Sequence, residues 1–261
     1  MLDTDHTRRL LWQKQRRAEL ARAVEQGAVA LLPTGAIEQH GPHLPLDTDI
    51  WSALAVSLGA AEQVDEFPVL VLPPIWWGLS PYWMGFPGTL TLQPETFIAV
   101  VYDVCRSVAH HGVRKLVIVN GHGGNAGVIQ AAAIKASGED LRVAALSYWD
   151  LVQEEMQRLG VRDGRSIGHA GEWETSIQLA LQPGCVDLDA ARPEQCTDLS
   201  GPLELVARAG AGAAYLPPEP RREAPHGVYG QALAGDHERG QALLDAAARR
   251  LAAFVRAFRA A

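Results

Sequence analysis

The sequence predicts an α/β fold in which helices cover both faces of a mainly parallel sheet. Short apolar segments alternate with amphipathic ones along the chain, and the connections between them are short. This alternation is typical of right-handed β–α–β units, which build parallel sheets. A chain of 261 residues can bury one large core, so we expect a single domain over residues 1–261.

The first half of the chain is expected to contain three helices and two strands. Apolar residues at helical spacing indicate a helix over residues 7–25, and residues 27–35 form a short apolar strand. A helix then starts at Asp49, which is a possible N-cap, and residues 67–75 form the second strand. Residues 94–112 are the third helix, with a proline in its first turn and a glycine at its end.

The second half of the chain is expected to add two strands and four helices. The apolar segments 114–120 and 141–148 are the strands. Helices are expected over residues 125–138, 151–160, 172–181 and 239–260. The Pro- and Gly-rich segment between Asp187 and His226 is expected to be an irregular excursion.

Composition narrows the class of protein. A net charge of −7 argues against binding to nucleic acid or to an anionic membrane. The N-terminus lacks the apolar core of a signal peptide, and no long apolar segment predicts a transmembrane helix. Cys105, Cys185 and Cys196 show no close pairing that would indicate a disulfide framework or a thiolate zinc site. We therefore expect a cytoplasmic protein with a small-molecule substrate.

Polar and aromatic residues follow each of the four predicted strands. Glu38 and His40 follow the first strand, and Ser80 follows the second. His122 follows the third strand, and Trp149 follows the fourth. Since ligands of open α/β sheets bind beyond the carboxyl ends of the strands, we expect these residues to meet at one edge of the sheet.

The residue types at this edge indicate a metal site. Glu38 and His40 are two residues apart, so an extended backbone points both side chains the same way. Carboxylate and imidazole groups are common ligands of Zn²⁺, Mn²⁺ and Fe²⁺, and Asp49 could bridge two such ions. A second polar segment, HAGEWETS, adds His169, Glu172 and Glu174 before a helix.

Other interpretations of these residues stay open. Taken alone, a Glu-x-His pair is more often a solvated loop pair, and Asp49 is more often a helix cap. The segment GHGGNA, from Gly121 to Ala126, also fits a loose dinucleotide-binding pattern. The acid that should close the next strand is missing, because Glu139 and Asp140 precede that strand. A nucleotide-binding oxidoreductase is therefore the less favoured alternative.

Four motifs give the sequence a specific resemblance. These are TGAIEQHGPHLPLDTD, FPGTLTL, VNGHGGN and HAGEWETS, and they span residues 29–181. The sequence resembles the creatininase family of metal-dependent amidohydrolases. That resemblance implies a three-layer α/β/α sandwich, a centre of two divalent metal ions (Zn, Mn or Fe) and a homohexamer.

The resemblance also implies which residues bind the metals. The first ion would be bound by Glu38, Asp49 and His122, and the second by His40 with the shared Asp49. Creatininase takes its last ligand from a Glu two residues after the histidine of the NGH motif, a position that is Gly124 here.

A carboxylate from elsewhere is then needed for the second ion. We expect Glu172 to be that ligand, because it is an acid where creatininase has an apolar residue. Glu174 would then orient a ligand from the second shell of the centre.

The function implied by the resemblance is hydrolysis by a metal-bound hydroxide. We expect attack on the carbonyl of a small cyclic amide, a formamide or a related non-peptide C–N substrate. His169 matches the catalytic histidine of the family, and Ser80, Gly123 and Trp149 match or approximate its substrate contacts. The aromatic residues Trp76, Trp77, Tyr82 and Trp83 could line a small planar ring or pack at a subunit interface. A catalytically silent family member is the other alternative.

Overall fold

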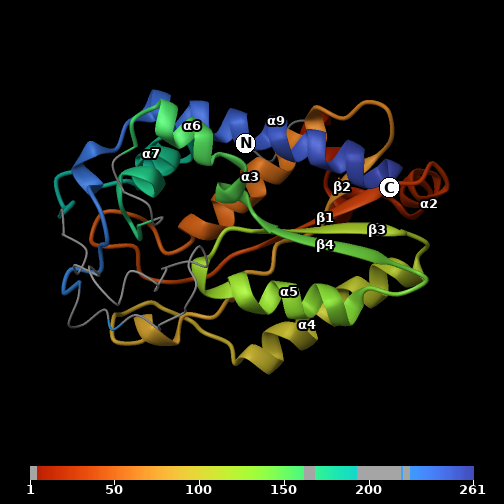
Figure 1. Cartoon of the computed structure of the whole chain (residues 1–261), viewed down its shortest axis with the longest axis horizontal. Coiled ribbons are helices and arrows are strands. Elements are labelled where there is room, and N and C mark those ends of the chain that lie inside the picture. The colour runs from red at the N-terminus through yellow and green to blue at the C-terminus, as the bar shows by residue number, and fades with distance from the viewer. Residues whose placement is uncertain (1–4, 162–167, 193–218, 220–223) are drawn as a thin grey trace.

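The computed structural model describes residues 5–161, 168–192, 219 and 224–261 (Figure 1). Within these residues the strands are β1 (Val29–Thr34), β2 (Val69–Val71), β3 (Lys115–Asn120) and β4 (Arg142–Ser147). The longer helices are α2 (Arg17–Glu25), α3 (Thr48–Glu62), α4 (Pro94–His110), α5 (Ala126–Ala136), α6 (Gln153–Arg158), α7 (Glu172–Leu181) and α9 (His237–Ala260). The predicted α/β fold with a parallel sheet is confirmed.

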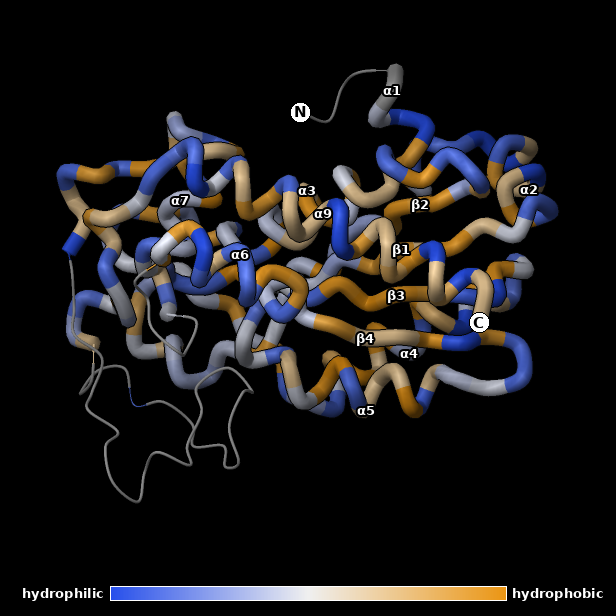
Figure 2. The backbone as a smooth tube through the Cα atoms, turned by 45° about the horizontal axis from the view of Figure 1, so that its top comes forward, coloured by the Kyte–Doolittle hydropathy of each residue, from blue (hydrophilic) through white to orange (hydrophobic). Residues whose placement is uncertain are grey.

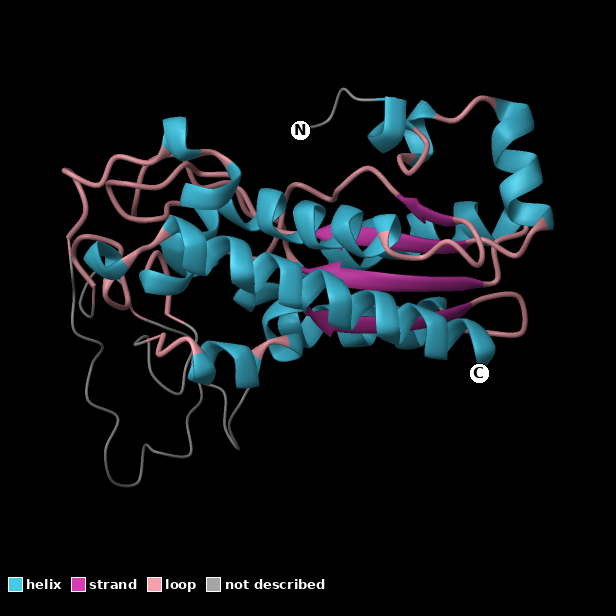
Figure 3. Cartoon of the chain, turned by 90° about the horizontal axis from the view of Figure 1, so that it is seen from above, coloured by secondary structure: helices cyan, strands magenta, loops and turns pink. Residues whose placement is uncertain are grey.

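All four strands are parallel, in the spatial order β2-β1-β3-β4. The register places Thr34 of β1 opposite Asn120 of β3, and Asn120 opposite Ser147 of β4. The last residue of each of these three strands is therefore polar, and the three lie in one row at the carboxyl edge of the sheet. In Figure 3 the strand arrows point toward the side of the molecule where the loops and α7 gather.

Helices cover both faces of the sheet (Figure 1). On one face, Val29 and Leu31 of β1 belong to an apolar cluster with residues of α3, α7 and α9. On the other face, Ala30 and Leu32 belong to a cluster with residues of α4 and α5. The strands are accordingly apolar along most of their length in Figure 2, as expected for a sheet buried on both sides.

The helix after β1 begins earlier than predicted. Asp47 is its N-cap and Thr48 its first residue, so Asp49 lies in the first turn and does not cap the helix. The Asp49 carboxylate is thereby free to face the carboxyl edge of the sheet, and its side chain is 2% exposed. The interpretation of Asp49 as a cap is wrong.

The N-terminal segment differs most from the prediction. Instead of one helix over residues 7–25, it forms α1 (Asp5–Arg8), a 3₁₀ turn (Trp12–Lys14) and α2. The break occurs because the chain runs alongside β2 there: the Val71 N–H donates to the Leu10 carbonyl (2.8 Å). Leu10 and Leu11 are buried against the sheet, so the segment covers part of the edge of β2.

The cysteines and the Pro- and Gly-rich segment between Asp187 and His226 are only partly described by the structure. Cys105 is buried and free, and Cys185 is exposed and free. Cys196 and most of the segment between Asp187 and His226 lie outside the described residues. Among the helices that the structure describes, none is long and apolar enough to cross a lipid bilayer.

Candidate metal centre

The loop that follows β1 turns acidic and imidazole side chains into the protein. Its course is set by the Glu38 N–H, which donates to the Leu46 carbonyl (3.0 Å), so the loop closes on itself before α3 begins. Glu38 and His40 are 1% and 0% exposed. Burial of ionisable groups is unfavourable unless each has a partner, so a simple surface turn does not account for this loop.

The row of polar strand ends positions His122. Asn120 accepts a hydrogen bond from the His122 N–H through Oδ1 (3.1 Å) and donates through Nδ2 to the His122 carbonyl (2.7 Å). Asn120 also contacts Thr34 and Ser147 on its two neighbouring strands. The end of β3 therefore fixes the backbone of His122 relative to β1 and β4.

The side chains of the loops after β1 and β3 meet side chains from the segment before α7 and from the first turn of α7. The structure forms three overlapping triads in which the possible ligand atoms lie within 4.8 Å of one another. The triads are Glu38–Asp49–His122, His40–Asp49–Glu174 and Glu38–His40–His169. Residues separated by more than 130 positions thus form one buried cluster of carboxylates and imidazoles.

Asp49 lies between two of the imidazoles. Its Oδ1 is 3.1 Å from His40 Nε2, and its Oδ2 is 3.0 Å from His122 Nδ1. Glu38 Oε1 lies 3.3 Å from the same His122 nitrogen, and Glu174 Oε2 lies 3.7 Å from the same His40 nitrogen. Each oxygen of Asp49 therefore belongs to a different triad, which is the arrangement of a bridging carboxylate.

The outer nitrogens of His40 and His122 face backbone carbonyls. His40 Nδ1 is 3.1 Å from the Glu38 carbonyl, and His122 Nε2 is 2.9 Å from the Leu79 carbonyl. A carbonyl oxygen only accepts, so each outer nitrogen carries the hydrogen when it donates there. A neutral imidazole of this tautomer would present the lone pair of its inner nitrogen to a bound cation, which is the form of histidine that binds metal.

The electrostatics of the cluster favour positive charge. Burial alone would lower the pKa of His40, but the adjacent Asp49 and Glu174 carboxylates outweigh burial and raise that pKa well above its ordinary value. Burial would likewise lower the pKa of His122, but the Glu38 and Asp49 carboxylates outweigh burial and raise that pKa well above its ordinary value. Burial raises the pKa of Glu174.

The donor set fits divalent cations. Glu38 Oε2 is buried and accepts no hydrogen bond from a described residue, and Asp49 Oδ2 is buried beside His122 Nδ1 at 3.0 Å without the geometry of a hydrogen bond. A buried carboxylate oxygen without a partner is unfavourable, and a cation supplies the missing interaction. Carboxylate and neutral imidazole are ligands that Zn²⁺, Mn²⁺ and Fe²⁺ share.

Glu172 and Glu174 take different positions from those we expected. The Glu174 side chain reaches His40, and its Oε2 also accepts the Ala170 N–H (2.5 Å). The Glu172 side chain is fully buried and forms an ion pair with Arg239 of α9, and it belongs to none of the triads. The structure therefore brings Glu174 and not Glu172 to the triads, and the expectation that Glu172 is the ligand stays a prediction.

Comparison with known proteins identifies the family. The family model described as "Creatininase: Creatinine amidohydrolase" matches residues 13–255. The creatinine amidohydrolase of Pseudomonas putida is 31% identical over 252 residues, which cover 90% of this chain and 92% of that protein. The chain belongs to the creatininase family.

Other relatives of this creatininase-family chain act on different substrates. The mycofactocin precursor peptide peptidase of Mycolicibacterium smegmatis is 33% identical over 189 residues, covering 70% of this chain and 69% of that protein. The 3-dehydro-scyllo-inosose hydrolase of Thermotoga maritima is 28% identical, covering 87% and 78%. The names of these relatives share hydrolysis as a reaction class and differ in substrate.

Solved structures agree with the family assignment. A crystal structure of creatinine amidohydrolase (creatininase) has a TM-score of 0.81 and 30% identity, covering 95% of this chain and 98% of that one. Related structures include a mutant creatininase of "Zn-Zn type" and "Creatininase Mn", each with a TM-score of 0.80 and 29% identity. Family members with this fold thus bind zinc and manganese.

The expected substrate residues of this creatininase-family chain lie at different depths. Ser80 is fully buried, and its hydroxyl is 3.2 Å from His122 Nε2. Gly123 begins the 3₁₀ turn Gly123–Asn125 directly after His122. Trp149 is 4% exposed and packs in the apolar cluster with α3 and α9. Ser80 and Gly123 therefore border the triads, whereas the described contacts of Trp149 are with the core.

Some of the aromatic residues after β2 lie beside the triads, and others lie at the surface. Trp83 is 2% exposed, and its ring stacks on His169 with the ring centroids 4.2 Å apart. Tyr82 OH lies 3.5 Å from His122 Nε2, and Trp77 is 50% exposed. Trp83 and Tyr82 thus border the centre, and Trp77 lies at the surface.

Several residues around the centre were not predicted from the sequence. Gln39 contacts His169 through both its main chain and its side chain. Tyr229 exchanges two backbone hydrogen bonds with His169, and Arg239 binds Glu172. Gln39 stands between Glu38 and His40, which was a usable signal. Nothing in the local sequence places Tyr229 or Arg239 near HAGEWETS.

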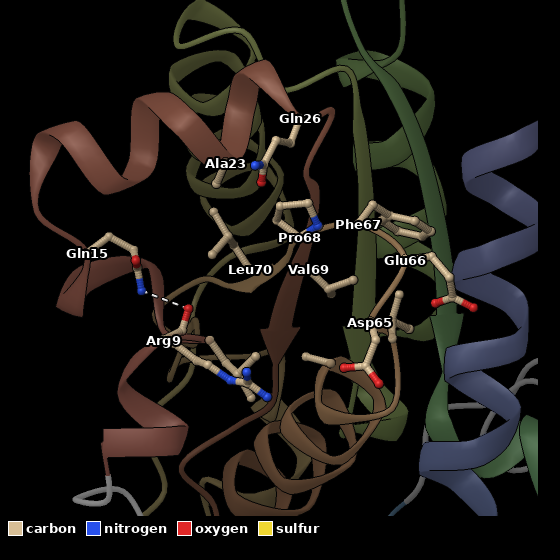
Figure 4. A pocket seen from close by; sticks show the side chains of 13 residues that line it. Arg9, Gln15, Ala23, Gln26, Asp65, Glu66, Phe67, Pro68, Val69 and Leu70 are labelled. Carbon is tan, nitrogen blue, oxygen red and sulfur yellow. Dashed lines mark hydrogen bonds between the residues drawn. The ribbon is translucent and has the colours of Figure 1, made fainter.

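A cavity of ≈650 Å³ lies at the opposite end of the sheet (Figure 4). Its lining includes the chain just before β2, from Asp65 to Pro68, and residues of α2 such as Ala23. None of the triad residues lines it. This cavity is therefore separate from the triads.

Proposed function

We propose that this chain is a metal-dependent amidohydrolase that holds two divalent ions and cleaves the C–N bond of a small cyclic amide or a formamide. The observation that carries the proposal is the position of Asp49, whose two oxygens face His122 and His40 separately. One carboxylate between two ligand groups, all of them buried, is the geometry that a dinuclear centre requires.

The residues divide into two ligand sets. Glu38, Asp49 and His122 would hold one ion, and His40, Asp49 and Glu174 would hold the other, as the first two triads indicate. Zinc and manganese forms of related structures support these metals.

Glu174 replaces the acid that creatininase carries at the position of Gly124. A Cβ at Gly124 would lie 2.1 Å from the Leu79 carbonyl oxygen and 2.5 Å from both His122 Nε2 and Tyr82 OH. That space is therefore filled by the protein, and a side chain at position 124 could not reach the ions without rearrangement.

The chemistry follows from this arrangement. When bound, two divalent ions supply a water whose pKa is lowered to about 7 and polarise the substrate carbonyl. His169 Nδ1 lies 3.5 Å from Glu38 Oε1, so this nitrogen faces the centre and can take a proton from the attacking water. The same nitrogen can return the proton to the leaving nitrogen. The buried Trp83 ring stacks on His169 and keeps water from that face.

The relatives support a small C–N substrate. The creatinine amidohydrolase of Pseudomonas putida aligns over 90% of this chain, whereas the mycofactocin peptidase aligns over 70%. Gly124 stands where creatininase carries an acid, and this difference favours a substrate other than creatinine. A short peptide remains the second class to test because of the peptidase relative.

The glycine loop fits the metal centre better than a dinucleotide. A Cβ at Gly121 would lie 2.2 Å from the Asp49 carbonyl oxygen, so this glycine allows the loop to approach α3. Together with the filled space at Gly124, this leaves Gly121 and Gly124 of GHGGNA packed against protein atoms. A pyrophosphate would need that room.

The proposal is tested by reconstituting the chelated protein with Zn²⁺, Mn²⁺ or Fe²⁺ and assaying cyclic amides, formamides and short peptides. His169→Ala should keep its metals and lose the chemical step by about 10²-fold or more, because the proton shuttle is removed. His110→Ala, at the exposed end of α4, is the matched control and should retain activity. Absence of turnover by the reconstituted wild type on every class, or full turnover by His169→Ala, would refute the proposal.

A further inference from the structure

The outer nitrogen of His169 has a donor and an acceptor next to it, both from Gln39. His169 Nε2 lies 2.7 Å from the Gln39 carbonyl oxygen and 2.9 Å from Gln39 Nε2. His40 differs, because its outer nitrogen faces only a carbonyl. Gln39 therefore offers both hydrogen-bonding roles to a single imidazole nitrogen.

The orientation of the Gln39 carboxamide is fixed by two backbone groups. The Gly41 N–H donates to Gln39 Oε1 (2.9 Å), and Gln39 Nε2 donates to the Gly227 carbonyl (3.0 Å). A flipped carboxamide would place its amino group against the Gly41 N–H and its oxygen against the Gly227 oxygen. One N–H of Gln39 Nε2 is thus used by Gly227, and the other is available to His169.

The His169 ring is held between two other rings. The Trp83 ring lies on one side with a centroid distance of 4.2 Å, and the His40 ring lies at 4.3 Å. The backbone of His169 is tied to Tyr229 by two hydrogen bonds of 2.9 Å and 2.7 Å. Because the ring is clamped, a change in its hydrogen bonding takes place by relocation of a hydrogen and not by rotation.

Either neutral tautomer of His169 is satisfied at Nε2. With hydrogen on Nε2, the ring donates to the Gln39 carbonyl; with hydrogen on Nδ1, Nε2 accepts from the Gln39 carboxamide. The contacts at Nε2 therefore do not by themselves select one of the two neutral tautomers. The choice is then made on the other side of the ring, where Nδ1 faces Glu38 Oε1 at 3.5 Å.

We propose that Gln39 is a positioning residue that supports both tautomers of His169, so that a divalent ion at Glu38 converts His169 into the tautomer whose Nδ1 is a base. Without a metal ion, the Glu38 carboxylate accepts a hydrogen bond from the Nδ1–H of His169, and this contact holds the Glu38 side chain in place. With a divalent ion bound, the Glu38 carboxylate would no longer accept from Nδ1–H, and a hydrogen on Nδ1 would be disfavoured by the nearby positive charge. The hydrogen leaves Nδ1 to water, another arrives from water at Nε2, and the ring stays neutral.

The catalytic use of this conversion rests on the proposed function, but the conversion can be measured without turnover. The ¹⁵N chemical shifts of histidine ring nitrogens report which nitrogen carries hydrogen. We would compare the chelated and the Zn²⁺-loaded protein, with His169→Ala used to assign the signals. In the wild type, Zn²⁺ should move the hydrogen of His169 from Nδ1 to Nε2.

Two variants of Gln39 sharpen the test. Gln39→Met keeps the length of the side chain and removes the donor, and Gln39→Glu keeps its shape with acceptors only. Both should hold His169 as the Nε2–H tautomer with and without Zn²⁺. Thr89→Val is the matched control, because it removes the hydrogen bond from the Gln39 N–H to Thr89 Oγ1 (3.1 Å) and leaves the carboxamide intact. In Thr89→Val, Zn²⁺ should move the hydrogen of His169 from Nδ1 to Nε2, as in the wild type.

The inference is wrong if wild-type His169 keeps one tautomer while metal analysis shows Zn²⁺ bound, or if Gln39→Met converts as the wild type does. The comparison of the chelated with the Zn²⁺-loaded wild type tests the proposal even if the Gln39 variants do not fold. Failure of the proposed function has a different signature, which is a conversion on Zn²⁺ binding without hydrolysis of any substrate class. If no Zn²⁺ binds, both proposals fall, and the metal analysis shows it.

Discussion

At the scale of single residues, the position of a carboxylate depends on its partner. Glu172 and Glu174 are two residues apart in the first turn of α7, and both are buried. Arg239 binds Glu172, so this charge is balanced away from the triads, whereas Glu174 meets His40. A buried carboxylate that already has an arginine is costly to leave unpaired and needs no further cation, whereas one that faces imidazoles can bind a metal.

This difference predicts opposite results for two equivalent substitutions. Glu174→Gln should weaken the second metal site, because a charged ligand is lost, with less effect on the stability of the metal-free protein. Glu172→Gln should retain the metals and destabilise the fold by about 1–3 kcal/mol, because Arg239 loses its charged partner. Metal titration and chemical denaturation of both variants check this. The reverse pattern would restore Glu172 as the ligand.

At the scale of secondary-structure elements, the contact between α7 and α9 positions Glu174. Gly240 of α9 lies so close to α7 that a Cβ there would be 1.9 Å from the Ser176 carbonyl oxygen. The Asp236 N–H also donates to Ser176 Oγ (3.0 Å) just before α9 begins. The C-terminal helix thus supports the helix that carries the proposed ligand.

Gly240→Ala should therefore force the two helices apart. The atoms that the new methyl group meets belong to the backbone of α7 and cannot move aside as a side chain would, so we expect a loss of about 1–3 kcal/mol in the free energy of unfolding. Gly127→Ala in α5 is the matched control: a Cβ there meets nothing within 4 Å, and helix propensity should stabilise it by about 0.5–1 kcal/mol. Equal unfolding midpoints for the two variants would show that the contact is unimportant.

The sequence predicted the elements whose signal is local. Apolar patterns contained within 6 to 17 consecutive residues predicted the strands β1, β3 and β4 and the helices α4 and α5. The structure confirms these elements. The break in the N-terminal helix was missed because it depends on pairing with β2, about 60 residues away. The contact of Glu172 with Arg239 was missed for the same reason, since Arg239 lies 67 positions further along the chain.

At the scale of the whole molecule, the family resemblance drawn from the motifs is confirmed by the family model and by the solved creatininase structures. The expectation of a hexamer stays a prediction. The sheet and the centre together determine how the stability of the protein depends on pH, because several ionisable groups are buried at the carboxyl edge.

His43 should make stability fall at acid pH. Burial, followed by the positive charge of His40, lowers the pKa of His43 to about 4 from 6.5. The folded protein keeps His43 neutral, so its contribution is fully present above pH 6.5 and is lost as pH falls toward 4. Linkage between these pKa values gives a loss of about 2 kcal/mol between pH 7 and pH 5.

Comparison with His43→Gln isolates this contribution, because the other buried groups titrate in both proteins. The variant can still pair with Thr175, whose hydroxyl lies 3.0 Å from His43 Nε2. Urea unfolding at a series of pH values, at equal metal content, should show a difference in stability that shrinks toward acid pH. A difference that does not vary with pH would mean that His43 titrates normally in the folded protein.

The most direct test of the metal centre is the metal content of the purified protein, measured by inductively coupled plasma mass spectrometry. The wild type should contain about two divalent ions per chain. Asp49→Ala should lose both, because Asp49 belongs to both ligand sets, and Asp47→Ala, outside the triads, should keep them. Little metal in the wild type after reconstitution with Zn²⁺, Mn²⁺ and Fe²⁺, or two ions retained in Asp49→Ala, would contradict the assignment of a dinuclear centre bridged by Asp49.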